Sequence, residues 1–331
     1  MKKILCIVCA IIIVLTMCSC APSKTGSLKK VSVCEVAHSV FYAPQYAAIK
    51  LGFFRDEGLD IDLVNGQGAD KVMTAVLSKQ VDIGFAGPEA SIYVCLEQKD
   101  DHPKVFAQLT KRDGSFIVGR APDPGFTFAK LKGKRIIGGR KGGVPEMTLE
   151  YVIKKSGLKL SDVTVDTSIQ FANMGGAFTG GLGDYVALFE PTASAVEKEG
   201  KGYVLASVGQ ESGEIPYTAY FANESYMKAN SETIQKFTNA IYKGQQWVKT
   251  AKPEEIAKTI ADFFPDTGVS LLTKVAERYK SIDAWSSDPI LNKDSFSRLE
   301  DVMAEAGELE KRVDYNDVVV TSYAENAVIA K

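Results

Sequence analysis

The sequence predicts an α/β protein with two lobes, because strand-like and helix-like segments alternate along it and one break divides them into two series. Apolar residues spaced three and four apart, such as Tyr46, Ile49 and Phe53, identify the helices. The first series has predicted strands at 31–36, 59–64, 82–86 and 104–109 and predicted helices at 44–54, 69–78 and 88–96. This alternation favours parallel sheets covered by helices.

The break lies at 121–125, where the run Ala-Pro-Asp-Pro-Gly continues neither a strand nor a helix. A second series follows, with predicted strands at 135–138, 163–167, 185–189, 203–207 and 217–221 and predicted helices at 145–155, 169–178 and 191–199. After Asn223 only helices are predicted, to about Ala306.

Two such series followed by helices predict a chain that leaves the first lobe, builds the second and returns. Two crossing strands would then form a hinge, and we place them near Gln108–Val118 and Pro216–Ala222. The predicted division is lobe one at 31–112 and 222–331 and lobe two at 113–221, with a parallel sheet in each lobe.

The N-terminus resembles a bacterial lipoprotein signal. Lys2 and Lys3 precede an apolar run from Ile4 to Met17, whose helical length of about 21 Å falls short of a bilayer core of about 30 Å. Cys20 follows the small Ser19 and is the predicted lipidation site, so residues 1–19 are interpreted as the signal peptide and 20–30 as a tether. The protein is then expected on the extracytoplasmic face of the cell membrane. The alternative is an ordinary cleaved signal.

Composition excludes several classes of protein. A formal net charge of −2 provides no basic stripe for nucleic acid, and two histidines suggest no metal site. Only Cys34 and Cys95 lie in the predicted folded body, so no disulfide framework is indicated. No Gly-x-Ser-x-Gly motif occurs, although counting residues leaves a Ser/His/Asp triad open.

Candidate ligand-binding residues lie where predicted strands end and helices begin, because ligands of open parallel sheets gather there. The candidates are His38, Phe41, Tyr42, Gly87, Glu89, Gly142, Gly143 and Glu190. Each has a structural alternative: acids favour first helical turns, glycine pairs form turns, and Phe41 suits a core.

Several motifs resemble one family of binding proteins. They are His38 to Tyr46, Gly52-Phe53-Phe54, Glu57-Gly58-Leu59, Gly68, Asp82-Ile83-Gly84 and Gly87. That family serves ABC importers of nitrate, sulfonates, taurine and thiamine pyrimidine precursors. The resemblance implies a type II periplasmic-binding-protein fold, permease subunits as partners, a monomer, and neither a cofactor nor catalysis.

The candidate acids favour one ligand class within that family. Carboxylates accept hydrogen bonds from N–H groups, so Glu89 and Glu190 suit an aminopyrimidine on which Phe41 or Tyr42 would stack. The alternative is an anion such as nitrate or a sulfonate, bound at helix N-termini with Arg140 and Lys141.

An enzyme is the alternative from another class. The same fold family contains a fungal and plant synthase that makes the thiamine pyrimidine. That enzyme carries a run of cysteines, whereas Cys34 and Cys95 are isolated here, and the export signal disfavours cytosolic biosynthesis.

Overall fold

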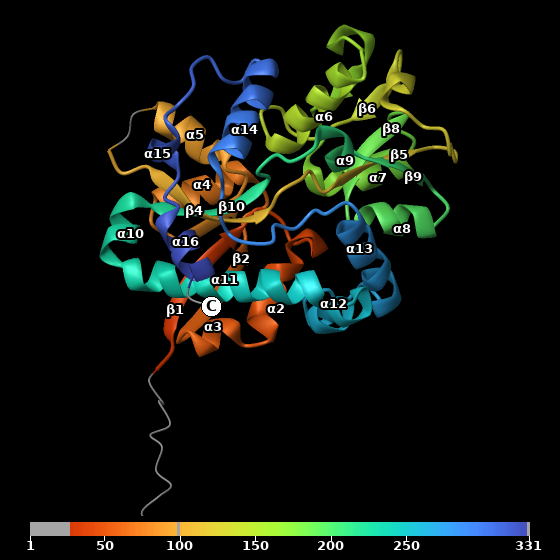
Figure 1. Cartoon of the computed structure of the whole chain (residues 1–331). Coiled ribbons are helices and arrows are strands. Elements are labelled where there is room, and N and C mark those ends of the chain that lie inside the picture. Colours follow the sequence, from red (N-terminus) through yellow and green to blue (C-terminus); the bar gives the residue numbers. More distant parts are fainter. Residues whose placement is uncertain (1–26, 98–99, 330–331) are drawn as a thin grey trace, which may run out of the picture.

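A five-stranded sheet organises each of the two lobes in the computed structural model, which describes residues 27–97 and 100–329 (Figure 1). The first sheet has the strand order β2-β1-β3-β10-β4 and the second has the order β7-β6-β8-β5-β9. The first contains β1 (Lys29–Glu35), β2 (Leu59–Asn65), β3 (Ile83–Ala86), β4 (Pro103–Thr110) and β10 (Thr218–Asn223). The second contains β5 (Ser115–Gly119), β6 (Arg135–Ile137), β7 (Thr164–Asp166), β8 (Tyr185–Phe189) and β9 (Tyr203–Ser207).

Each sheet is mixed, which corrects the prediction of purely parallel sheets. β10 runs antiparallel to β3 and β4, and β5 runs antiparallel to β8 and β9. These two strands are the ones that enter each lobe directly from the other lobe. A parallel neighbour needs a long crossover connection, whereas an antiparallel strand can follow a short one. The short connections between the lobes therefore account for the reversed strands.

The two crossings lie side by side. The first joins β4 to β5 through residues 111–114, and the second reaches β10 through residues 213–217. The Ile215 N–H donates to the Lys111 carbonyl at 3.0 Å, and the Tyr217 N–H donates to the Thr110 carbonyl at 3.1 Å. Residues 218–221 thus pair in the first sheet, although the predicted division placed them in lobe two.

The helices that follow the strands agree in order with the predicted ones. In lobe one, the predicted helix at 44–54 divides at Gly52, which adopts a left-handed φ of 81°. Lobe two also contains short 3-10 turns and one helix, α9, that the sequence did not predict. The lobe-one set is η1 (Val40–Tyr42), α2 (Ala43–Lys50), α3 (Phe53–Asp56), α4 (Ala69–Leu77) and α5 (Glu89–Leu96). The lobe-two set is η2 (Phe128–Leu131), α6 (Val144–Lys155), η3 (Leu160–Asp162), η4 (Phe171–Asn173), α7 (Met174–Thr179), α8 (Thr192–Lys198) and α9 (Val208–Ser212).

The C-terminal helices pack on both lobes. α11 lies along α2 at the base of lobe one, whereas α13 contacts α8 and α14 contacts α6, both in lobe two (Figure 1). The set is α10 (Glu224–Ala229), α11 (Ser231–Thr250), α12 (Pro253–Ile260), η5 (Ala261–Phe263), α13 (Val269–Ser281), α14 (Lys293–Glu305), α15 (Tyr315–Val318) and α16 (Ser322–Ile329). The helical end of the chain therefore connects the lobes a third time.

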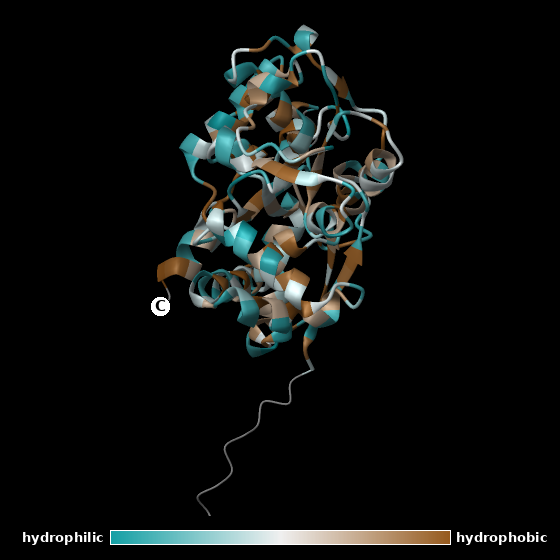
Figure 2. Ribbon diagram, turned by 90° about the vertical axis from the view of Figure 1, so that its right-hand side faces the viewer, coloured by the Kyte–Doolittle hydropathy of each residue, from teal (hydrophilic) through white to brown (hydrophobic). Residues whose placement is uncertain are grey.

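Apolar packing continues from one lobe into the other. The largest buried cluster is centred on the first sheet and also includes Phe116, Val144 and Met147 of lobe two. Two smaller clusters belong to lobe two alone. Figure 2 shows hydrophobic strands enclosed by helices with hydrophilic outer segments. The lobes are thus closed on each other in this structure.

Among the helices within residues 27–97 and 100–329, none combines the length and the apolar character that crossing a bilayer requires. Within the same ranges, Cys34 and Cys95 are free thiols. The predicted lipidation site, Cys20, lies outside the described residues.

Candidate ligand-binding site between the lobes

The loop after β1 is fixed by contacts to lobe two. Ser39 caps η1 by accepting a hydrogen bond from the Phe41 N–H at 3.2 Å, and its hydroxyl donates to the Glu190 carbonyl at 2.9 Å. A serine before a short helical turn is a favoured N-cap because its oxygen satisfies a free N–H group. The loop thereby places His38, Phe41 and Tyr42 at or beside the junction of the lobes.

Phe41 packs as a core residue of that junction. Its side chain is completely buried, with ring centroids 5.1 Å from Tyr279 and 5.7 Å from Phe189. Gly114 lies directly against it, since a Cβ at this position would come within 2.6 Å of the Phe41 ring. The buried Tyr42 ring lies 5.7 Å from Phe41 and 4.6 Å from Phe85. The aromatic pair therefore forms a wall between the lobes.

His38 serves a different contact. Its Nδ1 lies 2.8 Å from Glu35 Oε1, its Nε2 lies 2.7 Å from the Phe263 carbonyl, and its ring stacks on Phe264 at 4.7 Å. The hydrogen bond to Glu35 raises the pKa of His38, although partial burial acts in the opposite direction. His38 ties the first loop to the segment after α12, on a side of the loop away from the remaining candidates.

Glu89 is the acid that the structure leaves without a partner. It is the first residue of α5, it is only 2% exposed, and its Oε2 has no hydrogen bond. Its carboxylate folds back over Gly87, where any Cβ would collide with it. Burial raises the pKa of Glu89 to about 7, against the opposing effects of Arg140 and of the Val144 N–H. Glu89 therefore extends from lobe one to the start of α6 in lobe two.

The pair Gly142–Gly143 forms the facing part of lobe two. Gly142 has a left-handed φ of 74°, and its carbonyl accepts a hydrogen bond from the Tyr93 hydroxyl of α5 at 3.0 Å. Its N–H donates to Glu146 Oε2 at 3.1 Å, and Gly143 occupies the N-cap position of α6. The structure thus brings together Gly87, Glu89, Gly142 and Gly143, as the loops at strand ends predicted.

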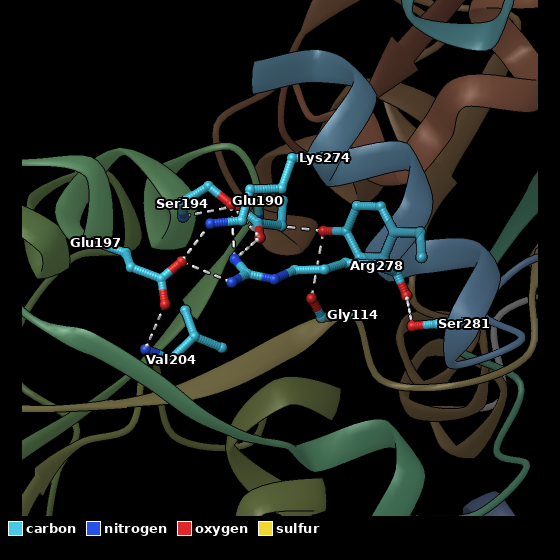
Figure 3. A network of polar contacts seen from close by, with 9 residues as sticks. Gly114, Glu190, Ser194, Glu197, Val204, Lys274, Arg278 and Ser281 are labelled. Atoms are coloured by element: carbon cyan, nitrogen blue, oxygen red, sulfur yellow. Dashed lines mark hydrogen bonds and ion pairs between the residues drawn. The ribbon is translucent and has the colours of Figure 1, made fainter. Parts of the chain in front are cut away.

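Glu190 is engaged by protein groups (Figure 3). Its Oε1 accepts hydrogen bonds from Arg278 at 2.7 Å and from the Ser194 hydroxyl at 2.8 Å, and its Oε2 accepts from the Ser194 N–H at 2.8 Å. Arg278 also pairs with Glu197 at 2.7 Å, which Lys274 approaches from the same helix. Both oxygens of Glu190 are therefore occupied, and its contacts do not support the expected role as a ligand acceptor.

This ionic network fastens α13 to α8. The Glu190 side chain is fully buried, and that of Arg278 is 20% exposed. The Tyr279 hydroxyl also donates to the Gly114 carbonyl at 3.3 Å and lies 3.1 Å from the Glu190 N–H. Helix α13 thus holds both a strand end of lobe two and the first crossing.

Two measured surface cavities lie away from this junction. One of about 320 Å³ is in lobe two beside Phe126 and Lys155, and one of about 140 Å³ lies beside Lys111 and Asp288. Neither is lined by the predicted site residues, so the candidate site is defined by its buried polar groups.

Comparison with known proteins places the chain in a family. Residues 40–256 match the family described as "NMT1/THI5 like". The chain belongs to the NMT1/THI5-like family. It is 44% identical to the "Putative binding protein YtlA" of Bacillus subtilis over 97% of this chain and 96% of that protein.

More distant members and structures bear different names. The chain is 26% identical to the 4-amino-5-hydroxymethyl-2-methylpyrimidine phosphate synthase of Aspergillus parasiticus, over 72% of this chain and 71% of the synthase. The alkanesulfonate-binding protein SsuA of Xanthomonas axonopodis, crystallised with MOPS, has a TM-score of 0.71 at 19% identity, over 90% of this chain and all of that one. The latter likeness establishes the periplasmic-binding-protein fold for this NMT1/THI5-like chain.

Sequence reasoning missed two polar residues of the junction, Asp113 and Tyr217. Each lies in a crossing, is almost fully buried, and carries an oxygen without a hydrogen-bond partner. The signal that was available is their position: segments predicted to form the hinge of two lobes also border the cleft between them.

We predict that Arg278→Gln destabilises the protein by about 3 kcal/mol, because it leaves the buried Glu190 carboxylate without its counter-charge. Urea unfolding at pH 7 measures the difference. Lys274→Gln is the matched control on the same helix, and its exposed ion pair with Glu197 should contribute less than about 1 kcal/mol. Equal effects of the two substitutions would contradict the structural role of Arg278.

A second prediction concerns pH. The raised pKa of Glu89 means that its protonated form stabilises the fold at low pH, and that this contribution is lost as the pH rises from the ordinary pKa of 4.5 through about 7. Glu89→Gln should therefore gain roughly 2–3 kcal/mol relative to wild type between pH 5 and pH 8 in ligand-free protein. Urea unfolding at both pH values tests this. Parallel pH profiles of the two proteins would show that Glu89 is not desolvated.

Proposed function

We propose that this protein is the extracytoplasmic solute-binding component of an ABC importer and that it binds a small planar solute rich in hydrogen-bond donors between its lobes. The observation that carries the proposal is the buried, unpartnered Glu89 Oε2 at the junction. A buried polar atom without a partner costs free energy that a ligand N–H would recover. The proposed site comprises Glu89, Gly87, Tyr42, Phe41, Gly142 and Gly143, with His38 and Glu190 supporting its edges.

The kind of solute follows from the groups around Glu89. A carboxylate accepts hydrogen bonds and favours amino groups, and the flat rings of Phe41 and Tyr42 suit a planar molecule. Distant relatives are named for the synthesis of a 4-amino-5-hydroxymethyl-2-methylpyrimidine phosphate, which supports an aminopyrimidine as the solute. A thiamine pyrimidine precursor is therefore the ligand we propose.

An anion is the second candidate. The matched structure of an alkanesulfonate-binding protein and the position of Arg140 near the start of α6 favour it. Glu89 opposes it, because an ionised carboxylate inside the site repels an anion. The two candidates therefore differ in what removal of the Glu89 charge does.

Binding without catalysis is the reading that the residues support. The 44% identical relative is named a binding protein, whereas the relatives named as synthases are at most 26% identical. In the part of the chain that the structure describes, the two cysteines lie apart, Cys34 on β1 and Cys95 on α5. A test for turnover of the bound pyrimidine would reveal an enzyme by the appearance of a product.

Glu89→Gln should weaken binding of 4-amino-5-hydroxymethyl-2-methylpyrimidine by roughly tenfold to a hundredfold, because an amide replaces the charged acceptor and adds a donor facing the ligand. Isothermal titration measures the affinity. Glu146→Gln is the matched control, since Glu146 is equally buried but accepts from the Gly142 N–H. An alkanesulfonate that binds wild type more tightly than the pyrimidine, and binds Glu89→Gln at least as well, would establish the anion instead.

We also propose that the protein is anchored to the membrane through a lipid on Cys20, as the Leu15–Cys20 motif predicts. Cys20→Ala should then move the protein from the membrane fraction to the soluble fraction, whereas Cys18→Ala should leave it membrane-bound. Fractionation followed by immunoblotting measures the distribution. A Cys20→Ala protein that stays in the membrane fraction would refute this anchor.

A further inference from the structure

Asp113 occupies the first crossing in an environment that leaves half of its carboxylate unused. Its Oδ1 accepts hydrogen bonds from the Ser115 N–H at 2.6 Å and the Ser115 hydroxyl at 2.5 Å. Its Oδ2 has no partner although the residue is completely buried. Burial raises the pKa of Asp113 to about 6, despite the opposing effect of Ser115. One oxygen is thus required by the local turn and the other is free to accept.

Tyr217 presents a matching group from the second crossing. The residue is 3% exposed, and its hydroxyl lacks a hydrogen-bond partner. Its ring lies 5.7 Å from Phe41 and 6.0 Å from Phe189, so it joins the aromatic wall formed by both lobes. The Tyr217 hydroxyl and the Asp113 carboxylate are close enough to shift each other's pKa but are not hydrogen-bonded.

The crossings and Glu89 belong to one buried region. Burial raises the pKa of Tyr217 far above its usual value, and Asp113, Tyr42 and Glu89 raise it further. Glu89 also raises the pKa of Tyr42. Electrostatic influence at this range requires proximity in a region from which water is excluded. Two unpartnered acceptors, Glu89 Oε2 from α5 and Asp113 Oδ2 from the crossing, therefore border the same aromatic wall.

We propose that Asp113 and Tyr217 form a second polar contact for the solute, so that the solute carries hydrogen-bond donors on two separate edges, one bound by Glu89 and the other by the crossings. This inference rests on the proposed function and narrows its ligand class. A molecule with a single anionic head would leave both carboxylates without a donor. An aminopyrimidine with a hydroxymethyl group has a donor on each of two neighbouring ring positions, as the site requires.

The competing explanation is an ordered water that bridges Asp113 and Tyr217 in every state of the protein. The two explanations differ in what removal of each group does. A structural water predicts lower stability and unchanged affinity, whereas a ligand contact predicts unchanged or higher stability of the ligand-free protein and lower affinity. Removing an unsatisfied buried group is not expected to destabilise the fold.

The experiment measures the affinity of wild type, Asp113→Asn, Tyr217→Phe and Glu89→Gln by isothermal titration, after their ligand-free melting temperatures. The probes are 4-amino-5-hydroxymethyl-2-methylpyrimidine and 4-amino-2,5-dimethylpyrimidine, which lacks the hydroxyl donor. Asp113→Asn keeps the Oδ1 acceptor for Ser115 and places an amide donor at the free position. We expect Asp113→Asn to weaken binding of the first probe about tenfold or more, and Tyr217→Phe to weaken it in the same direction.

With the second probe, only one of Glu89→Gln and Asp113→Asn should still cost affinity, because one donor edge is gone. Asp113→Asn and Tyr217→Phe proteins that bind the first probe like wild type would overturn the inference while leaving the role of Glu89 intact. Equal losses by both carboxylate variants on both probes would overturn it too, since that pattern indicates a general field. Wild type that binds neither pyrimidine would refute the proposed solute and this inference together. If Asp113→Asn does not fold, Tyr217→Phe decides between contact and water.

Discussion

Two short chain crossings constrain the rest of this molecule. Each crossing is only a few residues long and each is hydrogen-bonded to the other, so the strand that follows it has to enter its sheet in the reverse direction. The reversed strands β5 and β10 occupy equivalent positions in the two sheets, next to the edge strands β9 and β4. The remaining three strands of each sheet then point their carboxyl ends toward the other lobe. The facing loops that hold Glu89 and Gly142 are a consequence of this arrangement.

Closure of the lobes draws on three kinds of contact with different physical character. The aromatic wall around Phe41 is apolar and depends on burial. The network of Arg278 with Glu190 and Glu197 is ionic and lies at one side, where α13 meets α8. The crossings are main-chain connections that persist in any relative position of the lobes. A protein built this way can separate its lobes by giving up the first two while keeping the third.

The sequence was sufficient for the order of strands and helices because apolar periodicity and glycine or proline breaks are local signals. It was insufficient for strand direction, since β5 and β10 look like any other apolar strand and only their connections reverse them. It placed Glu89, Gly142 and Gly143 together because strand ends converge. It could not reveal that Glu190 is neutralised by Arg278, a residue on a helix far along the chain. Asp113 was treated only as part of a hinge, because its burial depends on packing from both lobes.

Gly87 controls the site without contacting a solute. The Glu89 carboxylate lies in the space that a β-carbon at position 87 would occupy, so this acid keeps its position only while residue 87 has no side chain. A single added methyl group would push the carboxylate out toward the facing lobe, changing the size and polarity of the space between them. Relatives with the same acid at the start of this helix can therefore differ in the solute they select through one small residue two positions before it.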